Sequence, residues 1–229
     1  MQPDRIEHIE RAVLSMVAQA LTDYRDQAIT IFREETDYPQ DIAEDVLREA
    51  IDSMGMSQMH ERLYGKVDLK KAIYVFAPDA EQVALMVDAK AEKDSRTATI
   101  QMSQTSMTVR QKRSGEVVEV RGSLDPFIVR GKRQMLVVTV IAKFVYTEST
   151  LGNELERIIV ACIPNGLLQE KYNPTEQDTI WLAGRNAPTL GEDFRVRLSY
   201  RHLAAKAAWR LVEIDCTQPK AISLMSDPD

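Results

Sequence analysis

The feature of this sequence that most constrains the fold is the apolar run Gln82–Lys90, which reads QVALMVDAK. A short apolar run with a charged end is typical of a central strand that is buried on both faces. Two further runs, Met135–Tyr146 and Arg157–Ile163, also predict strands. Strands of this kind need covering layers, so the sequence favours a sheet with other elements packed on it.

Before these strands, the first part of the chain has helical periodicity. Apolar residues between Ile6 and Ile31 follow three- and four-residue steps, which predicts one long helix that starts near Pro3. A second helix is expected from Asp41 to about Met54. Shorter segments with strand or hairpin signals are Lys71–Ala77, Thr108–Gln111, Val117–Arg121 and Phe194–Tyr200.

These elements predict an α/β fold with a mixed central sheet flanked by helices. The 229 residues suffice for one domain with a sizeable core. We therefore expect a single domain over residues 1–229, with an N-terminal helical arm at 1–60 and a core at 61–214.

Charge is distributed unevenly along the chain. The net charge is −6, but residues 1–60 carry 5 Lys and Arg against 13 Asp and Glu. Residues 61–214 carry 23 basic and 19 acidic side chains, so this part is mildly basic. A basic body permits a DNA-binding surface without requiring one, and the acidic start fits solvated helix faces equally well.

The sequence favours a cytoplasmic protein. Apolar runs stay shorter than the roughly 18 residues that a membrane-spanning helix needs. The N-terminus is acidic and polar, unlike a signal peptide. Cys162 and Cys216 lie far apart and are expected to remain reduced.

Three charged residues carry the predicted chemistry. Asp88 and Lys90 end the apolar run, and Asp68 lies upstream across a strand–turn–strand segment. Two carboxylates on neighbouring strands can share one Mg²⁺, to which the main-chain oxygen of Ala89 can be added as a ligand. Lys90 lies two residues beyond Asp88, so both side chains point to the same face of the strand. Such a site can activate a water molecule and neutralise a phosphodiester.

The pattern (D/E)-x-K is weak by itself, because Asp68-Leu69-Lys70 also fits it. The alternative for Asp88 and Lys90 is an ordinary ion pair at the end of a strand. Glu35 is expected to share the buried face of the first helix with Phe32 and to complete the site. A simple charge at a helix end is the alternative for Glu35.

Asp68 and the segment Asp88-Ala89-Lys90 resemble the PD-(D/E)xK nuclease site, with Val67 in place of the proline. Further short blocks follow in the order found in SfiI-type restriction endonucleases, a branch of that superfamily, which the chain resembles over roughly residues 64–219. The blocks are Val87–Ala91, Ser103-Gln104, Ser114–Val118, Lys171–Pro174, Ala183–Arg185, Gly191-Glu192, Arg195–Arg197, Trp209–Leu211 and Thr217–Pro219.

This resemblance implies a Mg²⁺-dependent type II restriction endonuclease of a prokaryotic cell. Its substrate would be double-stranded DNA with a GC-rich interrupted palindrome of two GGCC-like half-sites, cut with 3′ overhangs. Because a palindrome needs two symmetric readers, a homodimer or homotetramer is expected.

The resemblance also places base reading on the segment after the catalytic strand and on the C-terminal loop and strand. The matching basic residues are Arg96, Arg185 and Arg195. Gln104 is a further predicted DNA contact. Arg197 alternates with Arg195 on the same face of the Phe194–Tyr200 strand and is expected nearer the DNA backbone or a neighbouring carboxylate. Arginine suits guanine, because its fork donates to O6 and N7 together. A phosphate contact or a surface ion pair is the alternative for each arginine.

Two other functions stay open from the sequence. One is a repair or junction-resolving nuclease with the same metal site. The other is a non-catalytic DNA-binding or assembly protein that keeps the fold.

Overall fold

The computed structural model describes residues 1–54, 72–76, 83–93, 96–113, 115–150, 152–182, 195–217 and 222–224. Asp68 and Arg185 lie outside these residues, as does the side chain of Arg195.

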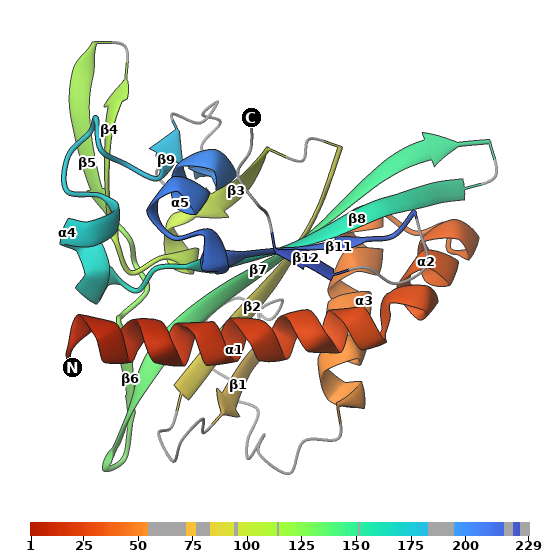
Figure 1. Cartoon of the computed structure of the whole chain (residues 1–229), viewed down its shortest axis with the longest axis horizontal. Coiled ribbons are helices and arrows are strands. Elements are labelled where there is room, and N and C mark those ends of the chain that lie inside the picture. The colour runs from red at the N-terminus through yellow and green to blue at the C-terminus, as the bar shows by residue number, and fades with distance from the viewer. Residues whose placement is uncertain are drawn as a thin grey trace.

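A mixed sheet forms the centre of the molecule (Figure 1). Its strands run in the order β1-β2-β7-β8-β11-β12, and β6 pairs with β7. β2 and β7 are parallel, whereas the other neighbours are antiparallel. The strands are β1 (Ala72–Phe76), β2 (Val83–Glu92), β6 (Phe127–Arg130), β7 (Arg133–Ser149), β8 (Gly152–Ile163), β11 (Leu211–Asp215) and β12 (Ile222–Leu224). The predicted mixed sheet is confirmed.

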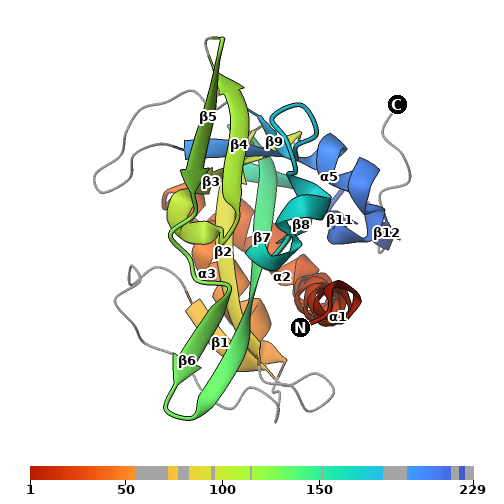
Figure 2. The same ribbon diagram turned by 90° about the vertical axis from the view of Figure 1, so that its left-hand side faces the viewer.

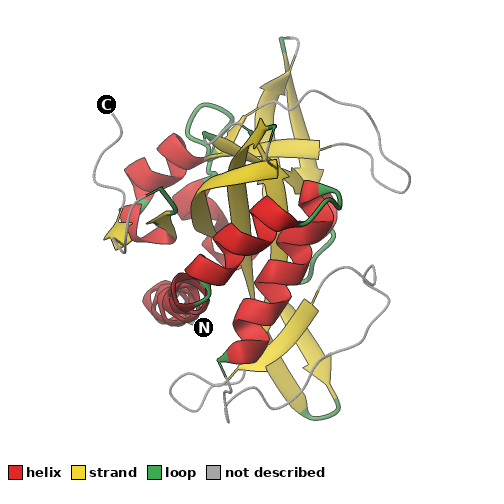
Figure 3. Ribbon diagram, turned by 90° about the vertical axis from the view of Figure 1, so that its right-hand side faces the viewer, coloured by secondary structure: helices red, strands yellow, loops and turns green. Residues whose placement is uncertain are grey.

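Three N-terminal helices cover one face of this sheet (Figure 3). They are α1 (Pro3–Asp23), α2 (Arg25–Glu34) and α3 (Pro39–Ser53). The second predicted helix is confirmed as α3. The prediction of one uninterrupted first helix is wrong, because the helix is broken at Tyr24 and α2 packs on β8. Arg25 is buried and donates to the Asp215 carbonyl at 2.7 Å, which ties the start of α2 to β11.

Gly152 permits α2 to approach the start of β8. Its φ of 123° is a conformation that favours glycine, and a Cβ there would lie 2.2 Å from the carbonyl oxygen of Arg33. On the same face, Phe32 stacks on Phe144 of β7 with ring centroids 5.5 Å apart.

A second, three-stranded sheet has the order β3-β10-β9. Its strands are β3 (Thr97–Gln101), β9 (Trp181–Leu182) and β10 (Arg195–Ser199), and it continues into α5 (Tyr200–Lys206). Short turns η2 (Met102–Gln104), η3 (Gly166–Leu168) and η4 (Ala208–Arg210) and helix α4 (Gln169–Tyr172) complete the connections.

Two hairpins project in opposite directions (Figure 2). One consists of β4 (Thr108–Arg113) and β5 (Glu116–Arg121), as the sequence predicted. Gly115 in its turn has φ of 92°, which suits glycine. The other joins β6 to β7 and was not predicted.

The two faces of β2 bury different neighbours. Val83, Leu85 and Val87 belong to the main core with the helices. Ala84 and Met86 point the other way, into a smaller apolar cluster. The alternation places Asp88 and Lys90 on this second face, away from the helices. No described helix combines the length and apolar character required to cross a membrane.

Candidate active site

The carboxyl end of β2 carries the predicted catalytic residues. The described pairing of β1 with β2 ends at Val87, and Asp88 and Lys90 follow in the last part of β2. Lys90 Nζ lies 2.8 Å from Asp88 Oδ2, with side chains 15% and 17% exposed. The structure therefore brings these two residues together in a partly enclosed position.

Gln40 of α3 contacts the edge of β2 beyond this described pairing. Its Nε2 donates to the Ala89 carbonyl at 2.8 Å, and its Oε1 accepts from the Ala91 N–H at 3.0 Å. The side-chain amide thus continues the hydrogen-bond ladder of β2 as a neighbouring peptide would. Nε2 also lies 2.9 Å from Glu44 Oε1, which brings an acidic residue of α3 close to this end of the strand.

A second charged pair lies beside the first. Lys90 of β2 is in register with Lys143 of β7, and parallel neighbours in register share a face. Lys143 is completely buried, and its Nζ lies 2.7 Å from Glu92 Oε2. It also donates to the carbonyl of Thr97 at the start of β3.

The oxygen atoms at this end of β2 fit a hard cation such as Mg²⁺. Asp88 Oδ2 is enclosed and, among the described residues, has Lys90 as its ion-pair partner but no aligned hydrogen-bond donor. The Ala89 carbonyl accepts from Gln40 and keeps a second lone pair. Within the described ranges, no three His, Cys, Asp or Glu side chains gather into a metal-binding group. The predicted second carboxylate, Asp68, lies outside those ranges and stays a prediction.

Glu35 does not have the position expected of it. It follows the last residue of α2 and is exposed, so the expectation that it shares the buried face of the helix is wrong. The helix ends at Glu34, and beyond its end the three- and four-residue spacing no longer sets the direction of a side chain. α2 packs on β8, which β7 separates from β2. A catalytic role for Glu35 stays a prediction.

Three of the arginines expected to contact DNA, namely Arg96, Arg195 and Arg197, lie in or next to the second sheet. Arg96 is exposed immediately before β3, and Tyr200 N–H donates to its carbonyl at 3.3 Å. Arg195 and Arg197 of β10 lie opposite Gln101 and Thr99 of β3. Two segments that are distant in the sequence are therefore brought to one small sheet.

The alternation along β10 is as expected. Val196 and Leu198 are buried with no exposed surface, while Arg197 is partly exposed. With the period of two, Arg195 shares the face of Arg197.

Gln104 is 1% exposed, and its Oε1 accepts from the Gln101 N–H at 2.9 Å in η2. This hydrogen bond ties Gln104 to the start of η2. A contact of Gln104 with DNA stays a prediction.

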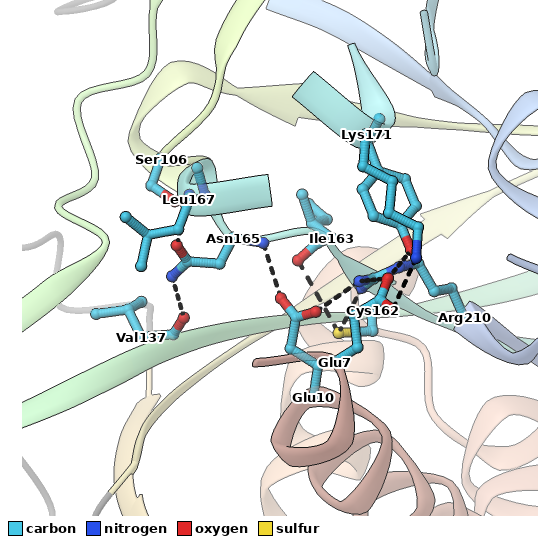
Figure 4. Close-up of polar contacts among 12 residues, drawn as sticks. Glu7, Glu10, Ser106, Val137, Cys162, Ile163, Asn165, Leu167, Lys171 and Arg210 are labelled. Atoms are coloured by element: carbon cyan, nitrogen blue, oxygen red, sulfur yellow. Dashed lines mark hydrogen bonds and ion pairs between the residues drawn. The ribbon is translucent and has the colours of Figure 1, made fainter. Parts of the chain in front are cut away.

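Two of the blocks that resemble the family, Lys171–Pro174 and Trp209–Leu211, take part in a buried network (Figure 4). Arg210 Nη2 lies 2.6 Å from Glu10 Oε2, and neither side chain is exposed. Glu10 Oε1 also accepts from the Asn165 N–H at 2.8 Å. The Arg210 guanidinium lies 4.4 Å from the ring centroids of both Tyr172 and Trp209. This network joins α1 to the C-terminal part of the chain.

The pKa values in and near this network reflect the balance between burial and the charged or hydrogen-bonding partners of each group. Burial raises the pKa of Glu10, although Arg210 and the Asn165 N–H oppose the shift. Burial would also raise the pKa of Glu7, but hydrogen bonds from Lys171 and Tyr172 outweigh it and lower that pKa. Both cysteines are free and buried, and burial raises the pKa of Cys216 to about 12. Neither cysteine has the lowered pKa of a nucleophile.

Sequence reasoning missed Gln40, Glu44, Glu92 and Lys143. A signal existed for two of them. Lys143 interrupts an apolar strand, and Glu92 continues the alternation of Asp88 and Lys90 along β2. No comparable signal marks Gln40, since a polar residue in the first turn of a helix is ordinary.

Comparison with known proteins identifies the family of this chain. The family model described as the type II restriction enzyme SfiI matches residues 5–214. The type II restriction enzyme SfiI of Streptomyces fimbriatus is 29% identical over 242 residues, which cover 95% of this chain and 89% of the relative.

Solved structures give the same picture. The tetrameric restriction endonuclease SfiI bound to cognate DNA matches with a TM-score of 0.81 and 26% identity, over 94% of this chain and 86% of that one. The restriction endonuclease BglI bound to its DNA recognition sequence matches with a TM-score of 0.75 over 94% and 92% of the chains; at 15% identity it supports the fold alone. The family model matches nearly the whole chain and the fold is shared with the solved SfiI structure, so this chain belongs to the SfiI family of type II restriction enzymes.

Proposed function

We propose that this chain is a Mg²⁺-dependent type II site-specific deoxyribonuclease that cuts both strands of DNA at a GC-rich interrupted palindrome with GGCC-like half-sites. The observation that carries the proposal is the Asp88–Lys90 pair, 2.8 Å apart at the end of β2, beside the free Ala89 lone pair. A prokaryotic cytoplasm, where such an enzyme meets foreign DNA, is the proposed location.

Different residues of the chain have different proposed roles at the scissile phosphate. Asp88, the Ala89 carbonyl and the proposed Asp68 would hold the metal ion. When bound, Mg²⁺ supplies positive charge at the phosphate and lowers the pKa of a coordinated water. Lys90 orients the attacking water and stabilises the negative charge that develops on the phosphate oxygens. Gln40 holds the Ala89 carbonyl through its hydrogen bond and so fixes the direction of that ligand.

Base reading is proposed for the second sheet and its approaches. Arg195 and Arg96 would contact the edges of guanine bases. Arg197 would contact the DNA backbone or a nearby carboxylate. Arg185, in the loop before β10, would approach the DNA beside them. β3 follows β2 directly in the chain, so a base-reading segment there would come right after the residues proposed for cleavage.

Assembly is proposed by similarity. The related SfiI structure is a tetramer bound to cognate DNA. A palindromic site requires at least a two-fold pair of readers, so we infer a homodimer or a homotetramer for this chain.

The testing experiment is digestion of a defined bacterial genome with the purified protein and Mg²⁺, followed by sequencing of every new end. The expected result is one discrete set of ends that share a GC-rich interrupted palindrome. The control is the Asp88→Ala variant, which should leave the genome intact under the same conditions. Metal-dependent cutting at DNA junctions without a shared sequence would replace the proposal with a structure-directed nuclease. Binding without cutting in any divalent metal would indicate a non-catalytic DNA-binding protein.

A further inference from the structure

Two lysines stand side by side next to the proposed cleavage site. Lys90 and Lys143 are register partners on the parallel strands β2 and β7, and both face away from the helices. Like charges on adjacent strands repel each other. Each ammonium group has its own carboxylate partner, since Lys90 pairs with Asp88 and Lys143 pairs with Glu92.

Lys90 has two carboxylates within reach along its own strand. Asp88 and Glu92 lie two residues before and two residues after it, so all three side chains share one face. Either carboxylate can attract the ammonium group. Lys90 pairs with Asp88 in this structure while Glu92 is held by Lys143 at 2.7 Å.

The position of Lys143 is strongly fixed. The side chain is 0% exposed, and the ammonium group also donates to the Thr97 carbonyl and lies 6.0 Å from the Tyr200 ring centroid. It therefore binds both ends of the connection from β2 to β3, at Glu92 and at Thr97. Because these contacts hold the buried ammonium group in place, Lys143 is a fixed positive charge opposite the Glu92 carboxylate.

We propose that Lys143 is a positioning residue for catalysis: by holding Glu92, it keeps Lys90 paired with Asp88 and aimed at the scissile phosphate. Lys143 acts through Glu92 and does not contact DNA. Without Lys143, Glu92 is an unpaired carboxylate two residues from Lys90 and draws the Lys90 ammonium away from Asp88. This inference rests on the proposed nuclease function.

The experiment compares single-turnover cleavage by the full-length wild type, Lys143→Met and the Lys143→Met/Glu92→Gln double variant. Enzyme is first bound to cognate DNA in Ca²⁺, the bound fraction is measured, and Mg²⁺ then starts the reaction. Rates are expressed per bound complex, so a loss of folded protein alone does not change them. Lys143→Met is expected to be slower by between about tenfold and 100-fold, as for a catalytic group displaced by about 1 Å. The double variant is expected to recover most of that rate, because glutamine does not compete for Lys90.

A matched control is Glu10→Gln, which weakens a buried ion pair far along the chain from β2. It should lower thermal stability while cleaving at the wild-type rate per bound complex. A Lys143→Met rate equal to wild type overturns the inference, and so does a double variant as slow as the single one. If the wild type itself does not cut DNA, the proposed function fails instead, so the two failures are distinguishable.

Discussion

Replacing Glu10 with alanine should destabilise the whole fold. Glu10 Oε2 lies 2.6 Å from Arg210, both side chains are fully buried, and Oε1 accepts from the Asn165 N–H at 2.8 Å. With alanine at this position, the Arg210 guanidinium stays buried and, among the described residues, keeps only the Glu7 carboxylate nearby, with Nη2 3.5 Å from Oε1. The Asn165 N–H also loses its Glu10 acceptor. Breaking one partner out of a buried pair costs about 3–5 kcal/mol of unfolding free energy.

That loss converts to a measurable temperature shift. For 229 residues, an unfolding entropy of about 2.1 cal/mol/K per residue gives about 0.5 kcal/mol/K. The melting temperature of Glu10→Ala should therefore fall by about 6–10 °C. The assay is thermal unfolding followed by circular dichroism without DNA, at one fixed protein concentration, because assembly also stabilises the fold.

Two variants test the reasoning behind this number. Replacing both Glu10 and Arg210 with methionine removes both buried charges, so the melting temperature should fall much less than in Glu10→Ala. Lys93→Ala breaks an ion pair whose side chains are 59% and 63% exposed, and should leave the melting temperature unchanged within error. A double variant as unstable as Glu10→Ala would refute the account, because the damage would then come from lost packing and not from an uncompensated charge.

Four further outcomes are expected. Asp88→Ala or Lys90→Ala should abolish cleavage and retain specific binding in Ca²⁺, with a loss of at least about 3 kcal/mol of transition-state stabilisation; near-normal cutting by Asp88→Ala would end the assignment. Arg195→Ala should weaken cognate binding by about 1–3 kcal/mol and random DNA little, whereas Arg197→Ala should weaken both alike at one fixed salt concentration; a uniform loss at Arg195 would make it a phosphate contact. Since the pKa of Glu7 is lowered in the folded protein, ionised Glu7 stabilises the fold above its usual pKa of 4.5, and this stabilisation is lost as the pH falls below that value. The difference in unfolding free energy between the wild type and Glu7→Gln, measured in urea, should therefore shrink toward zero in that range. A difference that stays constant with pH would contradict this. A plasmid with two sites should be cut faster than one with a single site if the enzyme is a tetramer, and equal rates with a dimer mass in light scattering would exclude it.

Local patterns predicted the elements that depend on local physics. β2 was found from its apolar run, and the β4–β5 hairpin from Ser114-Gly115 between alternating residues. α3 likewise matched its period of apolar residues. In each case the residues that specify the element lie within it, so one sequence window suffices.

The sequence did not predict structural features that depend on contacts between distant parts of the chain. Apolar residues keep their three- and four-residue spacing across Tyr24. The periodicity therefore could not reveal that the helix breaks there and that α2 packs on β8 as a separate helix. β3 is short and reads TATIQ, and it becomes a strand by pairing with β10, about a hundred positions away. Arg210 meets Glu10 across 200 positions, a pairing that no window contains.

The same limit applies to the catalytic neighbourhood, where the parallel register decides which charges meet. Lys143 reaches Glu92 because β2 and β7 are aligned so that Lys90 lies opposite Lys143. A slip of one residue would turn Lys143 toward the helices and bring Phe144 to the charged face, since the side-chain period of a strand is two. Phe144 would lose its stack on Phe32, and a buried ammonium group would lose its carboxylate. Both losses disfavour the slipped pairing, so the buried charge that positions Lys90 also helps to specify the register that makes the site.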